Sequence, residues 1–150
     1  MATGRSDAVR ELCGLVSELA QRISDHVGTC ASTLELTEAQ AVALRELTGP
    51  MTSRELARRM SCEPSNVTYV VDRLARLGLV ERQPDPHDRR AKQLVLTECG
   101  AKVRDDLLAT LVVDSPLEGL SAAEQRQLHD LLLRAIKESP NPKTRTRPRG

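Results

Sequence analysis

The sequence predicts a mostly α-helical protein with one small β-hairpin, on a chain of 150 residues that suits a single domain. Apolar residues recur every three or four positions along most of the chain, as they do on one face of a helix. Three Ser/Thr-x-x-Glu/Gln patterns mark helix starts. Between residues 79 and 96 the period changes, and two short runs flank a polar loop that contains prolines.

The N-terminal third predicts two helices. The first is expected at about 7–28, where one long apolar stripe holds Val9, Leu12, Cys13, Val16, Leu19, Ala20, Ile23 and Val27. The second begins at Thr37, where Thr37 and Gln40 fit a capping box, and it stops at Gly49-Pro50.

The middle of the chain predicts a short helix, a tight turn and a second helix. Thr52 and Glu55 fit another capping box, and Leu56, Ala57 and Met60 form the buried side of the short helix. Pro64 suits the first position of the next helix, because a missing N–H costs nothing there, and Gly78 ends that helix. The inner face of this second helix is expected to consist of Val67, Val70, Val71, Leu74 and Leu77.

The rest of the chain predicts a hairpin and two more helices. Residues 79–82 and 92–96 form the strands, and 83–91 form the loop between them. Thr97 caps a helix that runs to about 113, with Val103, Leu107, Leu108 and Leu111 inside. A third capping box, Ser121 with Glu124, opens the last helix, whose apolar residues are Leu128, Leu131, Leu132, Ala135 and Ile136.

A helix–turn–helix followed by a two-stranded wing is a DNA-binding architecture. The three-residue turn at 61–63 sets the second helix across the first, so its N-terminal end can enter a major groove. Its outer face carries Ser65, Asn66, Thr68, Tyr69, Asp72, Arg73 and Arg76. Asn66 suits bidentate pairing with adenine and Ser65 suits either base type, whereas Arg73 and Arg76 are better placed for phosphate. The alternative is a merely solvated helix face.

The wing carries Asp88, Arg89 and Arg90 at its tip. A long cationic side chain there can reach a neighbouring minor groove, and narrow grooves attract arginine in particular. An adjacent carboxylate can orient the guanidinium before it meets DNA. The alternative is a surface salt bridge, which contributes under about 1 kcal/mol.

The charge distribution favours a polyanion facing the middle of the chain. Residues 52–104 carry a net charge of +4, whereas residues 1–51 carry −3 and residues 105–138 carry −4, so the whole chain is near neutral at +1. The alternative is random scatter of charge. The segment 139–150 has four basic residues, no acidic ones and three prolines, and we expect it to be a disordered basic tail.

Several classes of function are excluded. Aromatic residues make up only 1% of the chain, with Tyr69 as the single tyrosine, so the stacking platforms of a single-strand binder are missing. No phosphate loop, G-x-S-x-G elbow or H-E-x-x-H motif appears, so we expect neither an enzyme nor a cofactor. No apolar stretch is long enough to span a membrane and no signal peptide is visible, which predicts a cytoplasmic location.

Several stretches together resemble the MarR family of bacterial transcription regulators. They are Leu56-Ala57-Arg58-Arg59-Met60, Val67-Thr68-Tyr69-Val70-Val71-Asp72-Arg73-Leu74, Gly78-Leu79-Val80-Glu81-Arg82, Asp85-Pro86-His87-Asp88-Arg89-Arg90-Ala91 and Leu96-Thr97-Glu98-Cys99-Gly100. They cover about residues 52–104, and the layout of the flanking helices fits the family up to about residue 138.

The resemblance implies a homodimer that binds a palindromic operator in double-stranded DNA, usually as a repressor that a small phenolic compound or an oxidant releases. Residues 1–36 and 105–138 become a helical dimerisation region, and 37–104 become the winged helix–turn–helix lobe. By position, Ser65, Asn66, Thr68 and Tyr69 meet the major groove and Arg73 the backbone. Arg90 becomes the minor-groove arginine, held by Asp88. The competing hypothesis is a dimeric thiol-redox or protein-interaction module with weak DNA affinity.

The four cysteines form no C-x-x-C pair, so the default in a reducing compartment is four free thiols. The position of Cys13 resembles that of the peroxide-sensing cysteine in one branch of the family, although that branch also relies on tyrosines near the thiol. Cys30, expected to be exposed in the loop after the first helix, is a candidate partner for an oxidised Cys13. Cys62 and Cys99 are further candidates. His26, His87 and His129 lie on three separate elements, so we expect no metal site.

Overall fold

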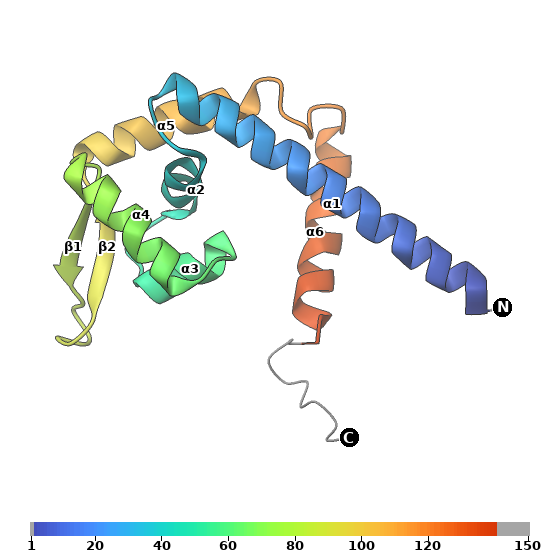
Figure 1. The fold of residues 1–150 in the computed structure, drawn as a ribbon, viewed down its shortest axis with the longest axis horizontal. Helices are drawn as coiled ribbons and strands as arrows, with labels where there is room; N and C mark the ends of the chain where they lie inside the picture. Colours follow the sequence, from blue (N-terminus) through green and yellow to red (C-terminus); the bar gives the residue numbers. More distant parts are fainter. Residues whose placement is uncertain (1, 141–150) are drawn as a thin grey trace, which may run out of the picture. The chain divides into compact units, whose positions relative to one another are not determined.

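The computed structural model describes residues 2–140 and confirms the predicted order of elements, namely helices, a two-stranded antiparallel wing and helices again (Figure 1). The elements are α1 (Ala2–Thr33), α2 (Glu38–Glu46), α3 (Ser53–Met60), α4 (Pro64–Arg76), β1 (Val80–Pro84), β2 (Lys92–Leu96), α5 (Glu98–Val112) and α6 (Ala122–Glu138). Backbone contacts divide the chain into two compact units, 1–116 and 117–150. The ten C-terminal residues of the expected basic tail, 141–150, lie outside the described part of the chain.

Helix α2 is the centre of the first unit, because it contacts α1, α3, α4 and α5. The core around it draws large, fully buried side chains from nearly every element of the unit. They are Leu44, Leu47, Leu56, Val67, Val71, Leu74, Leu94 and Leu107. In the described part of the chain, no helix combines the length and the apolar character needed to cross a bilayer.

The wing is anchored to the helices at its base. Strands β1 and β2 pair from Val80 with Leu96 to Pro84 with Lys92. Met51, just before α3, extends the pairing because it exchanges two backbone hydrogen bonds with Leu94, of 3.3 and 2.7 Å. The hairpin is therefore tied both to the end of α4 that precedes it and to the start of α3.

Two of the three predicted capping boxes are present in full, at Thr37 with Gln40 and at Ser121 with Glu124. At the third, the Thr52 hydroxyl accepts from the Glu55 N–H, but the Glu55 carboxylate does not return to the cap. It binds Arg58 and Arg59 instead, because two charged donors on the next turn compete better than one backbone N–H.

Helix α1 is longer than predicted, since it spans Ala2–Thr33 rather than about 7–28. Gly28 does not end it, because Cys30 and Ala31 on the following turn are buried in the core. The prediction that Cys30 lies exposed in a loop is therefore wrong: it lies within the helix and is only 4% exposed. The inner face of α4 is confirmed except at Leu77, which follows the last helical turn and is exposed.

The start of α5 packs directly on the backbone that joins α4 to β1. The Thr97 N–H donates to the Leu79 carbonyl over 3.1 Å, and its hydroxyl donates to the Gly78 carbonyl over 2.6 Å. Gly78 adopts a φ of +72°, which glycine tolerates without strain. Gly100 follows one turn later, and a Cβ placed there would lie 1.9 Å from the Leu79 carbonyl oxygen. Only glycine fits at position 100.

We predict that Gly100→Ala lowers the free energy of unfolding by about 3 kcal/mol, because the new methyl group meets backbone atoms that cannot rotate away. Urea denaturation followed by circular dichroism measures the change. Gly28→Ala is the matched control, because its nearest neighbour is the Glu38 Oε2 atom at 3.9 Å. This helix-interior substitution should stabilise the fold by about 0.5–1 kcal/mol. Equal effects of the two substitutions would contradict the steric argument.

Candidate nucleic-acid interface

The turn between α3 and α4 is held by backbone hydrogen bonds. Ser61 caps α3 in the left-handed conformation with a φ of +53°, and its N–H points to the carbonyls of Ala57 and Arg58. The Cys62 N–H also donates to the Ala57 carbonyl, over 3.1 Å. A left-handed serine was not expected from the sequence, since glycine is the usual residue in such a cap. This turn fixes the start of α4 at Pro64.

Helix α4 has the two faces that its periodicity predicts. Val67, Val70, Val71 and Leu74 are buried, and every residue assigned to the outer face is exposed: Ser65, Asn66, Thr68, Tyr69, Asp72, Arg73 and Arg76. The Thr68 hydroxyl donates to the Pro64 carbonyl over 3.2 Å, which holds that side chain against its own helix. The N-terminal half of the exposed face thus carries small polar groups and one aromatic ring.

Tyr69 and Arg73 form a pair on this face. The Arg73 guanidinium donates to the Tyr69 hydroxyl over 2.6 Å and lies 5.1 Å from the centre of the ring. A cation over an aromatic face gains about 0.5–1 kcal/mol at an exposed site. The contact restrains the guanidinium along the helix surface and leaves its remaining N–H groups as donors for an anion.

An ion pair that the sequence did not reveal joins α4 to the wing. The Arg82 guanidinium on β1 donates to the Asp72 carboxylate over 2.6 Å. Both residues are visible in the sequence, but no spacing rule connects a helix to the strand that follows it. The pair sets the direction of the strand relative to the exposed face of α4.

The tip of the wing is shaped by two aspartates that cap backbone N–H groups. The Asp85 carboxylate accepts from the His87 N–H over 2.8 Å, and the Asp88 carboxylate accepts from the Arg90 N–H over 3.0 Å. We expected Asp88 to hold the Arg90 guanidinium; the structure instead has it binding the Arg90 backbone, as short aspartate side chains do in turns. The side chains of Arg89 and Arg90 are exposed.

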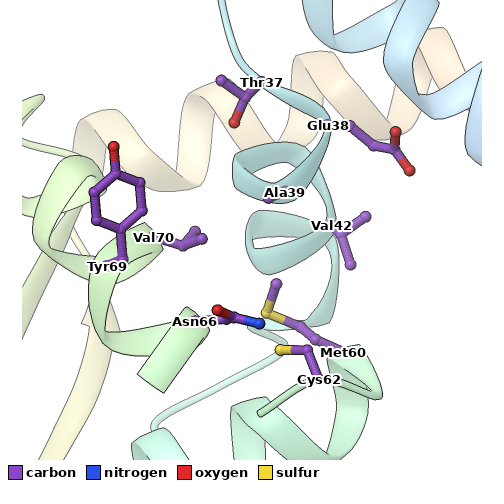
Figure 2. Close-up of a pocket in the computed structure, with 9 residues that line it drawn as sticks. All are labelled: Thr37, Glu38, Ala39, Val42, Met60, Cys62, Asn66, Tyr69 and Val70. Carbon is purple, nitrogen blue, oxygen red and sulfur yellow. The ribbon is translucent and has the colours of Figure 1, made fainter. Parts of the chain in front are cut away.

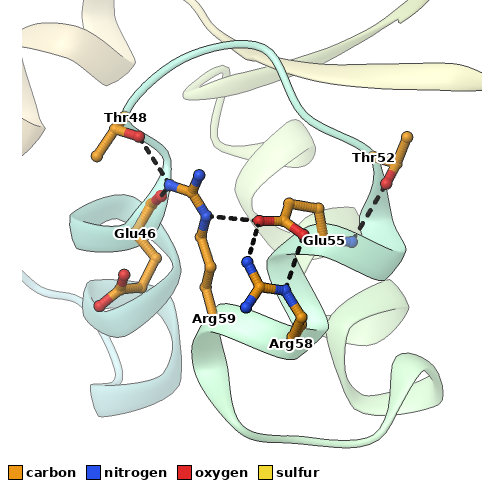
Figure 3. Close-up of polar contacts among 6 residues, drawn as sticks. All are labelled: Glu46, Thr48, Thr52, Glu55, Arg58 and Arg59. Carbon is orange, nitrogen blue, oxygen red and sulfur yellow. Dashed lines mark hydrogen bonds and ion pairs between the residues drawn. The ribbon is translucent and has the colours of Figure 1, made fainter. Parts of the chain in front are cut away.

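Helix α3 is fastened to the end of α2 by a cluster of charged side chains (Figure 3). The Glu55 carboxylate binds Arg58 at 2.6 Å and Arg59 at 3.0 Å. Arg59 continues to the Thr48 hydroxyl at 2.8 Å and to the Glu46 carbonyl at 3.3 Å. The hydrogen bonds from the two arginines lower the pKa of Glu55 to about 2, and the same contact raises the pKa of Arg58.

We predict that this cluster stabilises the fold at neutral pH and loses its effect in acid. Because the pKa of Glu55 falls from its ordinary value of 4.5 to about 2 on folding, the stabilisation is complete above pH 4.5 and disappears as the pH falls towards 2. The melting temperature of Glu55→Gln should lie below that of the wild type at pH 7, and the gap should close between pH 4.5 and 2.

The matched control is Glu63→Gln, because the Glu63 side chain makes no hydrogen bond to the α4 N-terminus that it precedes. Its melting temperature should follow that of the wild type across the whole pH range. A constant gap between wild type and Glu55→Gln from pH 7 to 2 would contradict the assignment.

The structure separates the two candidate redox cysteines. Cys13 is exposed and Cys30 is buried, and both lie on α1, 17 residues apart. A helix rises about 1.5 Å per residue, so their Cα atoms are about 25 Å apart, whereas a disulfide needs about 7 Å or less. The two thiols of one chain therefore cannot pair while α1 is intact. Burial also raises the pKa of Cys30, which lowers its reactivity.

Cys30 has a partner that sequence reasoning missed. His26 lies one turn earlier on α1, and its Nε2 atom is 3.7 Å from the Cys30 sulfur and 3.0 Å from the Leu111 carbonyl on α5. The i, i+4 spacing was visible in the sequence. Within residues 2–140, no three His, Cys, Asp or Glu side chains come together as metal ligands. We interpret the pair as a contact that joins α1 to α5.

These features define a winged helix–turn–helix protein that binds DNA, and the comparisons with known proteins identify its family. The MarR family model matches residues 36–92, and the chain belongs to that family. A helix–turn–helix transcriptional regulator of Mycobacterium tuberculosis is 31% identical over 120 residues, which cover 73% of this chain and 80% of that protein. The repressor NicR of Pseudomonas putida is 29% identical over 90% of this chain and 88% of its own length.

The fold is shared with solved structures of the family. A mutant of MarR from E. coli in complex with operator DNA matches with a TM-score of 0.69 and 27% identity, over 87% of this chain and 96% of that one. This protein is therefore a DNA-binding transcriptional regulator. Regulators of this family are not enzymes.

Proposed function

We propose that this protein is a homodimeric repressor that binds a palindromic operator and is released by a small molecule or an oxidant. The observation that carries the proposal is the exposed polar face at the start of α4, next to a wing whose tip presents two arginines. NicR, to which the chain is similar over most of its length, is a repressor, and the MarR mutant was solved with operator DNA.

In this proposal each part of the interface has its own role. The major-groove residues are Ser65, Asn66, Thr68 and Tyr69, the backbone residues are Arg73 and Arg76, and the minor-groove residues of the wing are Arg89 and Arg90, with Asp88 shaping the loop. Small side chains at the start of α4 allow base edges to approach closely. The arginines further along the helix neutralise phosphates, which gives affinity without sequence preference.

The homodimer is proposed because two helices expose apolar surface. On α1, Leu12 is 61% exposed, and Val9, Leu15 and Val16 are exposed as well. On α6, Ile136 is 70% exposed, no residue is buried, and Leu131, Leu132 and Leu133 are also exposed. Apolar stripes of this kind on a DNA-binding protein fit an interface between copies of the chain. We accordingly assign dimerisation to 1–36 and 105–138 and DNA binding to 37–104.

Fluorescence anisotropy tests the proposal. The probe is a labelled duplex from the DNA upstream of the protein's own gene, with a shuffled duplex as the control. Preference of a hundredfold or more for the native duplex would support specific regulation, since specific sites exceed non-specific ones by about 10³–10⁷. Sedimentation of the free protein at micromolar concentration should give the mass of two chains. A monomer without preference for either duplex would contradict the proposal.

The oxidant arm of the proposal depends on Cys13, which is the exposed thiol on the apolar stripe of α1. If an organic peroxide releases the operator, dithiothreitol should restore binding and Cys13→Ser should abolish the response. If peroxide has no effect on the operator complex, the release mechanism is a small-molecule effector.

We predict that Asn66→Ala relaxes base preference more than it weakens binding in general. A bidentate contact to a base contributes about 1–3 kcal/mol of discrimination, so the ratio of operator to shuffled-duplex affinity should fall between about fivefold and 150-fold. Anisotropy titrations with both duplexes measure the ratio. Equal losses on the two duplexes would rule out base contact by Asn66.

We predict that Arg90→Ala weakens operator binding about tenfold or more and leaves the dimer intact. An arginine inserted in the minor groove also releases counterions, so the slope of log Kd against log salt should fall by about one unit. Arg126→Ala, on α6, removes the same charge elsewhere and serves as the control. An unchanged dissociation constant for Arg90→Ala would remove the wing arginine from the interface.

A further inference from the structure

A cavity of about 600 Å³ lies between α2 and α4, beside the turn that joins α3 to α4 (Figure 2). Its walls are formed by Thr37, Glu38, Ala39, Val42, Met60, Cys62, Asn66, Tyr69 and Val70. The volume is within the range of small-molecule sites, which run to about 300–1,000 Å³. All of these residues belong to the first unit of the chain, so the cavity is complete within one copy of that unit.

The lining is apolar with a few polar groups at its edge. Ala39, Val42 and Val70 supply aliphatic surface, and Met60 and Cys62 add two polarisable sulfur atoms. The polar groups are the Thr37 hydroxyl, the Asn66 amide and the Tyr69 hydroxyl, and the Tyr69 ring offers the one aromatic surface. This combination suits a small molecule that has an apolar, partly aromatic body and one polar end.

The only charged side chain in the lining is Glu38, and no lysine, arginine or histidine is present in it. One Glu38 carboxylate oxygen accepts a hydrogen bond from the Ser24 hydroxyl on α1. Among the ion pairs of the described residues, none includes Glu38, so its negative charge is not neutralised by a neighbour. A negative charge at the wall attracts a cation and repels an anion.

Two residues of the wall belong also to the DNA-facing surface. Asn66 and Tyr69 are exposed on the outer face of α4 and line the cavity from its side. Tyr69 in turn restrains Arg73, which does not line the cavity. A molecule seated against Asn66 and Tyr69 therefore acts on the side chains that our proposed function assigns to the major groove and, through Tyr69, on a backbone contact.

We propose that this cavity is the effector site, that it takes a small, partly aromatic molecule that is neutral or cationic, and that its occupation weakens operator binding. The proposal rests on the function proposed above. Glu38 selects the charge of the ligand, and Asn66 with Tyr69 couple the ligand to DNA. Anionic aromatic acids are excluded from this site by the same carboxylate.

Cys62 provides a reporter for the cavity, because it is partly exposed and forms part of the wall. In a full-length Cys13→Ser, Cys99→Ser variant the only other thiol is Cys30, which is buried. The rate of Cys62 alkylation by the neutral reagent iodoacetamide is followed by mass spectrometry. It is measured alone, with benzyltrimethylammonium chloride, and with sodium benzenesulfonate at the same ionic strength.

We expect the aromatic cation to slow Cys62 alkylation at least threefold at millimolar concentration and the aromatic anion to leave the rate unchanged. Glu38→Gln in the same background should remove most of the protection by the cation. In the wild type, the exposed Cys99 lies outside the cavity and should react at one rate in all three solutions. Equal protection by both ions, protection by neither, or full protection that survives Glu38→Gln would overturn the proposed selectivity.

The coupling to DNA is tested with the wild type by operator anisotropy. The cation should raise the operator dissociation constant at the concentrations that protect Cys62, whereas tetramethylammonium chloride at the same ionic strength should not. If the operator is bound specifically but its affinity ignores the aromatic cation, the effector role fails and the proposed function stands. If the protein prefers no duplex, the proposed function fails, and the coupling to operator binding fails with it; Cys62 protection still decides the ligand class.

Discussion

The arrangement of the DNA-binding lobe depends on the contact between the start of α5 and the backbone that joins α4 to β1. Thr97 binds the carbonyls of Gly78 and Leu79, and Gly100 lets the two backbones approach closely. This contact fixes the point where the chain leaves α4 and enters the wing. Since α4 carries the polar face and the wing carries the arginines, one junction sets the relation between the two surfaces that meet DNA in the proposed function.

Around that junction, polar contacts rather than apolar packing set the direction of each element. Arg82 with Asp72 orients the wing against α4, and Arg59 with Thr48 fastens α3 to the end of α2. Arg104 on α5 caps the end of α2 through the Leu44 and Arg45 carbonyls. Arginine suits these positions because its planar fork holds two acceptors at once. Leucine and valine fill the space between elements, and the arginines specify how the elements lie.

Local signals in the sequence predict the elements well, because their causes are local. The Thr37 and Ser121 capping boxes, Pro64 at the start of α4 and Gly78 after it lie where their chemistry requires. The failures occur where partners compete or lie far apart in the chain. Glu55 abandons its cap for two arginines, and α1 continues past Gly28 because burial of the following turn outweighs the weak helix propensity of glycine.

The candidate site divides in the same way. The exposed face of α4 follows from helical periodicity, so its residues could be named from the sequence. The cavity could not, because it is formed where α2 passes α4 and its lining comes from four separate stretches of chain. Asn66 and Tyr69 belong to both surfaces, since they stand at the edge of α4 between its outer face and α2 (Figure 2). A side chain at that edge has one set of rotamers to satisfy both neighbours. Occupation of the cavity and contact with a base are therefore coupled through the same few torsion angles, and this coupling requires no movement of the helices.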